Sequence, residues 1–95
     1  MGNSVEMYKG LFIFLMNECP SKVLIFLLNP NKKSYMSGIA RNLNITYSWL
    51  IKILQVLYKA EMISNKKVGR RKYIILTEKG KLIAEQLNNV RKLCL

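Results

Sequence analysis

A short basic segment near residue 70 is the clearest place where side-chain types and spacing suggest a chemistry. Its seven positions hold five cations and no acidic residue: Lys66, Lys67, Arg70, Arg71 and Lys72. Lysine and arginine bind phosphate oxygens, and an arginine can also enter a narrow minor groove of DNA. Lysines that served only solubility would be spread out and mixed with glutamates, so we favour phosphate binding over a merely solvated segment.

Polar side chains also recur at helical spacing between residues 46 and 59. Ser48, Lys52 and Gln55 are about one turn apart, so on a helix they share one face. In a major groove, glutamine can pair with adenine, lysine can reach guanine or a phosphate, and serine can contact a base or the backbone. The competing interpretation is an ordinary solvated helix face. The candidate DNA contacts of this segment are Thr46, Tyr47, Ser48, Lys52, Gln55 and Lys59.

The charge of the whole chain supports a polyanionic partner. Its 95 residues include 16 lysines and arginines against 5 acidic residues, for a formal net charge of +11. Ten of these cations lie between residues 31 and 76, where Glu61 is the only acid. Such a surplus repels itself in a compact domain unless a polyanion lies against it. We therefore expect nucleic acid as the partner, with Lys32, Lys33 and Arg41 as flanking phosphate contacts.

The sequence excludes most catalytic chemistry. It contains no histidine, and all five acidic residues are glutamates, so it has no aspartate either. A Ser-His-Asp triad, an imidazole base and a histidine-containing zinc site are therefore impossible. The two cysteines, Cys19 and Cys94, form no CxxC pair, and two thiols cannot complete a four-ligand metal site. We expect no catalysis, no metal and no cofactor, and the sequence reveals no small-molecule effector.

Two apolar runs bear on the location of the protein. Leu11–Met16 and Val23–Leu28 are each far shorter than the roughly 20 residues that span a bilayer. No basic leader with a small-residue cleavage site precedes them. We therefore expect a cytoplasmic protein that is not embedded in a membrane.

The elements that would position these residues begin with two helices. Asn3 and Glu6 form a capping box that opens the first helix. This helix should end near Glu18, because Pro20 lacks the amide needed to continue it. The apolar run inside it could instead be a strand, since periodicity cannot settle six residues. A second helix should cover Lys22–Leu28.

Two further helices should follow, joined by a tight turn. Gly38–Leu43 reads as a short helix that Ser37 can cap, and Asn44 tolerates the left-handed conformation that ends a helix. Thr46 should then cap a longer helix, Tyr47–Ala60.

The periodicity of this fourth helix separates an apolar face from a polar one. Leu50, Ile53, Leu54 and Leu57 fall on one face, opposite Ser48, Lys52, Gln55 and Lys59. Trp49, Ile51 and Val56 lie outside the apolar face. We expect Trp49 to pack on the basic hairpin or the preceding helix, the alternative being contact with DNA or a second subunit.

The basic segment should be a hairpin that leads into a last helix. Met62–Lys67 and Lys72–Leu76 read as two strands joined by Val68–Arg71, with Gly69 supplying the turn. Thr77 should cap the final helix.

Both ends of the chain suggest a homodimer. The first helix is apolar on all sides, and a coiled-coil seam of four residues recurs in the last helix. Alternatively, both helices fold back on their own domain. In a parallel pairing Cys94 would meet its own copy, whereas in an antiparallel pairing it would not. The predicted interface residues are Tyr8, Phe12, Leu15, Ile83, Leu87, Val90 and Cys94.

The order of these elements resembles a winged helix-turn-helix, and several segments make the resemblance specific. They are Ile39–Ser48, Leu54, Leu57, Met62-Ile63 and Leu76-Thr77-Glu78-Lys79-Gly80. The chain is similar to MarR-type and archaeal winged-helix regulators, over roughly residues 21–87. One departure is Glu61, which stands where these proteins usually place glycine. Abundant Ile, Asn, Lys and Tyr also suits AT-rich coding, as in some archaea and their viruses.

The resemblance implies a mainly α fold with a small β-hairpin, in one winged-helix domain over residues 1–95. Residues 1–19 would be a dimerisation segment, 20–76 the winged helix-turn-helix core and 77–95 the C-terminal helix. It also implies a sequence-specific transcription regulator that binds double-stranded DNA. The first twenty residues and the tail match nothing specific in these proteins, and the homodimer is expected from those end segments. Helix 47–60 would enter the major groove, and the wing, 66–72, would contact the backbone or minor groove. The alternatives are a nucleoid-coating protein with little sequence preference and a protein–protein adaptor.

Overall fold

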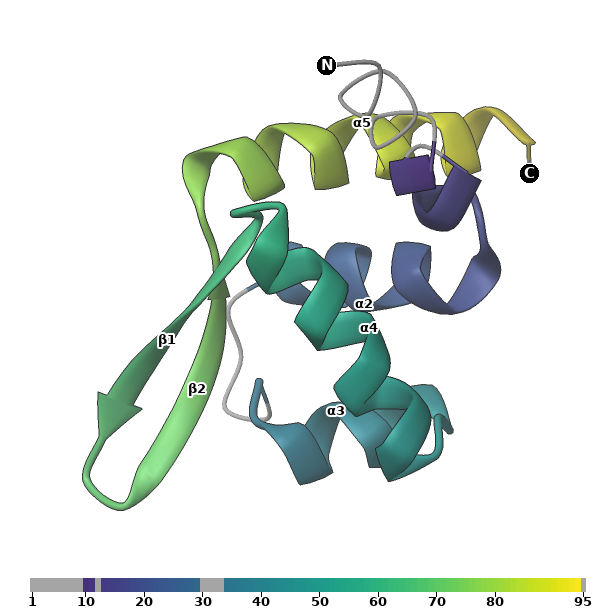
Figure 1. Cartoon of the computed structure of the whole chain (residues 1–95). Coiled ribbons are helices and arrows are strands. Elements are labelled where there is room, and N and C mark those ends of the chain that lie inside the picture. The colour runs from purple at the N-terminus through teal and green to yellow at the C-terminus, as the bar shows by residue number, and fades with distance from the viewer. Residues whose placement is uncertain (1–9, 12, 30–33, 95) are drawn as a thin grey trace.

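The computed structural model describes residues 10–11, 13–29 and 34–94 (Figure 1). Its elements are, in chain order, α2 (Glu18–Leu28), α3 (Met36–Leu43), α4 (Tyr47–Lys59), β1 (Ile63–Val68), β2 (Arg71–Leu76) and α5 (Glu78–Cys94). Residues 10, 11 and 13–15 are also helical, which confirms the N-terminal helix over those positions. Its predicted capping box lies outside the described residues. The mainly α fold with one β-hairpin is confirmed.

The break between the first two helices lies earlier than the sequence predicted. It falls at Met16 and Asn17, and α2 already begins at Glu18, so the prediction that α2 starts at Lys22 is wrong. Pro20 sits in the first turn, where a missing amide costs nothing because those amides have no partner within the helix. The error came from treating the proline as a helix terminator.

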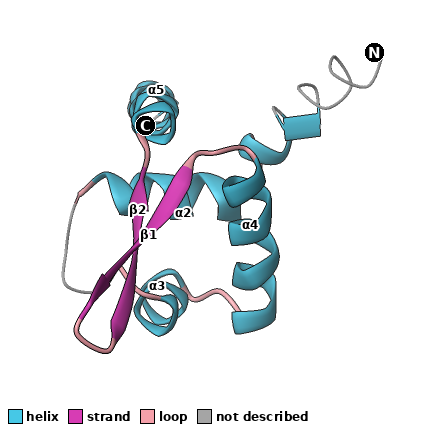
Figure 2. Cartoon of the chain, turned by 60° about the vertical axis from the view of Figure 1, so that its left-hand side comes forward, coloured by secondary structure: helices cyan, strands magenta, loops and turns pink. Residues whose placement is uncertain are grey.

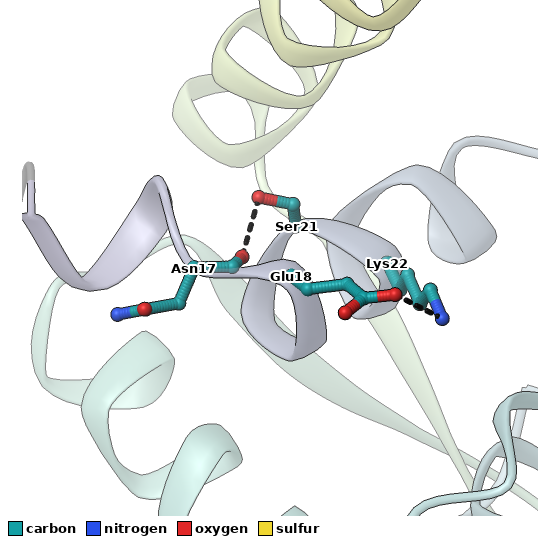
Figure 3. Close-up of polar contacts among 4 residues, drawn as sticks. All are labelled: Asn17, Glu18, Ser21 and Lys22. Atoms are coloured by element: carbon teal, nitrogen blue, oxygen red, sulfur yellow. Dashed lines mark hydrogen bonds and ion pairs between the residues drawn. The ribbon is translucent and has the colours of Figure 1, made fainter.

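The first turn of α2 is stabilised by its own side chains (Figure 3). The Ser21 hydroxyl donates to the carbonyl oxygen of Asn17 over 2.8 Å. Lys22 forms an ion pair with Glu18 at 2.8 Å, and its ammonium group holds the pKa of that carboxyl below the ordinary value. Both ion-pair partners are well exposed, so the pair fixes local geometry more than it stabilises the fold.

The turn between α3 and α4 follows the sequence prediction. Asn44 has φ 55° and ψ 48°, the left-handed conformation that ends α3. Thr46 caps α4, because its hydroxyl accepts a hydrogen bond from the Trp49 amide at 3.3 Å. The start of α3 differs from the prediction: the helix begins at Met36, so Ser37 lies inside it and is not its cap.

The corner after α4 shows the structural roles of two positions in the pattern that resembles winged-helix proteins, Glu61 and Gly80. Glu61 adopts φ 59°, a left-handed conformation that glycine would take more easily. Its carbonyl accepts a hydrogen bond from the Thr77 hydroxyl at 2.7 Å, which holds the corner. The same hydroxyl accepts from the Gly80 amide at 3.1 Å and caps α5, as predicted. A Cβ on Gly80 would lie 1.9 Å from the Met62 carbonyl oxygen, so only glycine allows α5 to approach this backbone.

The hairpin has a two-residue loop and an antiparallel register that pairs Val68 with Arg71. Gly69, in the loop, has φ +63°, as the first central residue of a tight hairpin turn requires. The strands end closer to the loop than predicted, by one residue each. On the other edge of β2, the Ile74 amide donates to the Ser34 carbonyl at 2.7 Å.

The core lies where α2, α3, α4 and the base of the hairpin meet. The four residues predicted for the inner face of α4 are all buried. Fully buried large side chains are Val23, Leu24, Ile39, Leu50, Ile53, Leu57 and Met62.

Figures 1 and 2 show two opposite ends of the molecule. At one end lie α3, the start of α4 and the tip of the hairpin, which we call the wing end. At the other lie α5 and the helical residues before α2, which we call the α5 end. The core separates them.

Candidate nucleic-acid interface

The outward face of α4 carries the polar residues that the sequence singled out. Tyr47, Ser48, Lys52, Gln55 and Lys59 are all exposed, on a helix whose opposite face is buried. Thr46 is exposed too, but its hydroxyl already accepts the capping hydrogen bond. The buried face of α4 thus packs against the core, while its opposite face is exposed to solvent.

The wing presents the densest positive charge. All five predicted cations of the hairpin are exposed, and within residues 34–94 none of them forms an ion pair. Lys67 and Lys72 are direct cross-strand partners. Like charges in this position repel each other, and an anion bound between them would relieve the repulsion. The hairpin therefore suits contact with phosphate.

An aromatic cluster fixes one of these cations, and the sequence reading missed it. The Arg71 guanidinium lies 4.3 Å from the centroid of the Tyr35 ring, a cation–π contact. Tyr35 also meets Tyr73 edge to face, with centroids 6.0 Å apart. Together with the Ser34–Ile74 hydrogen bond, this cluster attaches the hairpin to the residues that precede α3.

A second contact joins the wing to α4. The Tyr58 hydroxyl donates a hydrogen bond to the Asn65 side-chain oxygen of β1. Burial raises the pKa of Tyr58 above its ordinary value, so the phenol keeps the proton that it donates. This contact also escaped the sequence reading, since a tyrosine on a helix and an asparagine on a strand give no pairing signal.

A cleft lies between α4 and the wing, and residues from both elements line it. The α4 side contributes Tyr47, Ile51, Gln55 and Tyr58, and the hairpin contributes Arg70, Arg71 and Lys72. Of the predicted recognition residues, the cleft thus brings Tyr47 and Gln55 together with three wing cations. Ser48, Lys52 and Lys59 lie farther round the exposed face of α4 and do not line it.

The remaining candidates lie at other places. Arg41 is exposed in the last turn of α3, whereas Lys32 and Lys33 are outside the described residues. Trp49 does not line the cleft with the wing, and 41% of its surface is exposed.

The predicted dimer residues fall into three groups. Leu15 is buried in the core of its own chain, and Ile83 and Leu87 pack partly against that core. Val90 and Cys94 are exposed, at the α5 end. Tyr8 and Phe12 lie outside the described residues. The structure also exposes apolar residues that the sequence reading did not select: Ile13, Met16, Leu82 and Leu93.

Two properties hold for the part of the chain that the structure describes. No helix there is long and apolar enough to cross a membrane. No group of three or more Cys or Glu side chains gathers closely enough in those residues to hold a metal ion.

Comparisons with known proteins agree with this geometry. A family model described as winged helix-turn-helix matches residues 22–94. The chain is similar to the solved structure of AF1382 from Archaeoglobus fulgidus, with 28% identity and a TM-score of 0.72, covering 85% of this chain and 92% of that chain. A comparison with curated proteins gives no match.

Two further solved structures share the fold. MepR, a transcription regulator of the Staphylococcus aureus multidrug efflux pump MepA, is 24% identical, with a TM-score of 0.73 over 92% of this chain and 69% of that chain. A ZitR variant from Lactococcus lactis is 21% identical, with a TM-score of 0.74 over 98% and 74%. The helix-turn-helix, the wing and the matched family model lead to one conclusion: this chain belongs to the winged helix-turn-helix family.

Proposed function

We propose that the protein is a transcription regulator that binds double-stranded DNA with sequence preference, as a homodimer. In this proposal α4 enters the major groove, and the wing contacts the backbone or the minor groove. The observation that carries it is the cleft at the wing end, where Tyr47, Ile51 and Gln55 of α4 face the same space as three wing cations.

The electrostatics support a duplex rather than a small anion. The wing and the exposed face of α4 both carry exposed cations, and no acidic residue interrupts the wing. A protein that neutralises several phosphates releases their counterions, so its affinity falls steeply with salt. Phosphate contacts would fix the position of the protein, and side chains of α4 would supply the sequence preference.

The α5 end supports a homodimer. An apolar groove there is lined by the residues before α2 and by α5, and several apolar side chains beside it are exposed. Exposed apolar patches on a small domain mark contact surfaces. Because the patch faces away from the wing, two copies could pair through it and present two wings to successive turns of DNA.

Selection from random duplex DNA, followed by a salt titration of the selected site, tests the proposal. We expect a palindromic consensus, and a binding constant that falls linearly with salt on a logarithmic scale. Equal affinity for the selected site and for random duplex would contradict sequence preference and would point to a DNA-coating protein. Unchanged affinity after alanine substitution of Arg70, Arg71 and Lys72 would point to an adaptor.

A further inference from the structure

The side of α4 that faces the wing is less polar than its outward face. Tyr47, Ile51 and Gln55 follow one another at intervals of one turn along the cleft. Tyr47 is 53% exposed and Ile51 is 41% exposed, although isoleucine is among the residues most often buried. Neither the core nor the hairpin covers these two side chains. An apolar ligand group that reaches the cleft would cover them.

The position of the cleft determines which part of α4 can meet the bases. A duplex that touches both α4 and the wing must lie across the mouth of the cleft between them. The backbone strand between the two grooves then crosses the cleft beside the wing cations, and the base edges next to that strand face Ile51 and Gln55 on the cleft side of α4. Lys52 and Lys59, farther round the helix, would face the phosphates along one wall of the groove.

The major groove offers one apolar group on the base edges, the C5-methyl group of thymine. It contacts apolar side chains, whereas the amide of glutamine pairs with the N6 and N7 edge of adenine. Apolar Ile51 and the ring of Tyr47 therefore suit thymine, and Gln55, one turn further on, suits adenine.

We propose that Ile51 and Tyr47 contact thymine methyl groups while Gln55 binds adenine, so that each half-site is centred on A·T base pairs. This inference rests on the proposed function, because it requires α4 to lie in a major groove. It assigns the sequence preference to the side of α4 that faces the wing, and leaves Ser48, Lys52 and Lys59 with backbone contacts.

A second copy of the chain is a less suitable cover for Ile51. The apolar groove that would receive a second copy lies at the α5 end, away from the cleft. The cleft is also bordered by three cations, which would repel the same surface of another copy. Those cations attract the DNA backbone instead.

Replacing thymine by uracil tests the inference, because uracil differs only by the missing methyl group. The selected duplex is synthesised with uracil in both half-sites, and a control duplex carries uracil only outside them. We expect the half-site replacement to weaken binding of the unaltered protein about fourfold for each contacted methyl. The control duplex should bind like the thymine duplex.

Two variants then assign the effect to a residue. Ile51→Ala should lose about a fourfold part of the thymine preference and keep the part that Tyr47 supplies. Ile75→Ala is the matched control, because Ile75 has the same exposed fraction, 41%, but lies on the hairpin outside the cleft. It should keep the full preference for thymine. The measurement on the unaltered protein needs no variant, so a folding defect in Ile51→Ala would leave the test intact.

Three results would overturn the inference while the proposed function stands: a selected half-site of G·C pairs, equal binding of the thymine and uracil duplexes by the unaltered protein, or an undiminished thymine preference in Ile51→Ala. If selection yields no preferred sequence at all, the proposed function itself fails. The two failures are therefore distinguished at different steps.

Discussion

The two ends of the molecule expose side chains of opposite character. The wing end exposes cations that have no acidic partner within residues 34–94, and the α5 end exposes apolar side chains such as Leu82 and Leu93, which are 63% and 87% exposed. Exposed charge keeps a domain soluble, whereas an exposed apolar surface favours association. The exposed side chains of each end therefore indicate the kind of partner that it binds: a polyanion at the wing end and an apolar surface at the α5 end.

The ends also differ in how their exposed residues are held. At the wing end, an aromatic cluster, a backbone hydrogen bond and the Tyr58–Asn65 contact fix the hairpin before any partner arrives. At the α5 end, the exposed apolar side chains lie on α5 and on the residues before α2. Prearranged contacts reduce the entropy that binding costs, so we expect the wing end to bind with less rearrangement than the α5 end.

The largest expected effect on folding stability comes from disturbing the contact between α5 and the corner after α4. In Gly80→Ala the added Cβ would lie 1.9 Å from the Met62 carbonyl oxygen, so α5 must move away from the corner after α4. We expect the free energy of unfolding to fall by at least about 3 kcal/mol and the melting temperature by more than about 10 °C. Thermal unfolding followed by circular dichroism measures both.

Gly10→Ala is the control for this variant. An added Cβ on Gly10 meets no atom within 4 Å, and the residue is helical, so the substitution should be neutral or slightly stabilising. Equal stability of the two variants would show that α5 does not need its close approach to Met62.

The second prediction removes the apolar character of the α5 end. Leu82 and Val90 both line the apolar groove and are more than half exposed. Replacing both by lysine would place charges in the proposed interface of each copy, and we expect the dimer dissociation constant to rise by about 10³-fold or more. Analytical ultracentrifugation over a range of concentrations measures it.

The same lysine substitution at Ile75 separates an interface effect from a general effect of added charge. Ile75 is exposed on the hairpin, away from the α5 groove, so Ile75→Lys should leave the dimer intact. If the protein without substitutions is monomeric at high concentration, the α5 end is not a dimer interface.

The sequence predicted the wing end better than the α5 end, and the reason is physical. A run of cations without acids, a turn at Gly69 and the periodic apolar face of α4 are all local patterns, and the structure reproduces them. Thr46, Asn44 and Thr77 were predicted as caps or turn residues for the same reason. The hydrogen bonds by which they cap or end a helix join residues three or four positions apart.

Contacts between distant segments could not be predicted in this way. Tyr35 and Arg71 are far apart in sequence, and their contact depends on the hairpin folding back beside the start of α3. Helical spacing likewise selected Leu15 as an interface residue, and in the structure this side chain packs in the core of its own chain. Periodicity identifies an apolar face but not the surface that covers it.

The third prediction removes charge from the wing end. Alanine at Arg70, Arg71 and Lys72 together should weaken DNA binding on the order of 10²-fold at 0.1 M salt. The slope of log affinity against log salt should become shallower by about 2 to 3, because up to three phosphate contacts are lost. Fluorescence anisotropy with a labelled duplex at several salt concentrations gives both quantities.

A triple alanine variant at Lys79, Lys81 and Lys92 is the control, since it removes equal charge from α5. These lysines lie on the helix of the α5 end, so the salt slope should change little. A similar loss in both variants would mean that total charge, rather than the wing, determines the affinity.

The smallest predicted effect tests whether contacts within the protein hold the wing in place before DNA binds. Tyr35→Leu removes the ring that lies under the Arg71 guanidinium and meets Tyr73, whereas Tyr35→Phe keeps a ring in both contacts. A cation–π contact at an exposed site stabilises by about 0.5–1 kcal/mol, so Tyr35→Leu should weaken DNA binding about twofold to fivefold. Because no phosphate contact is removed, the salt slope should stay constant. Tyr35→Phe should bind like the unaltered protein. A shallower salt slope in Tyr35→Leu would instead mean that Tyr35 itself, or the arginine it releases, accounts for a lost phosphate contact.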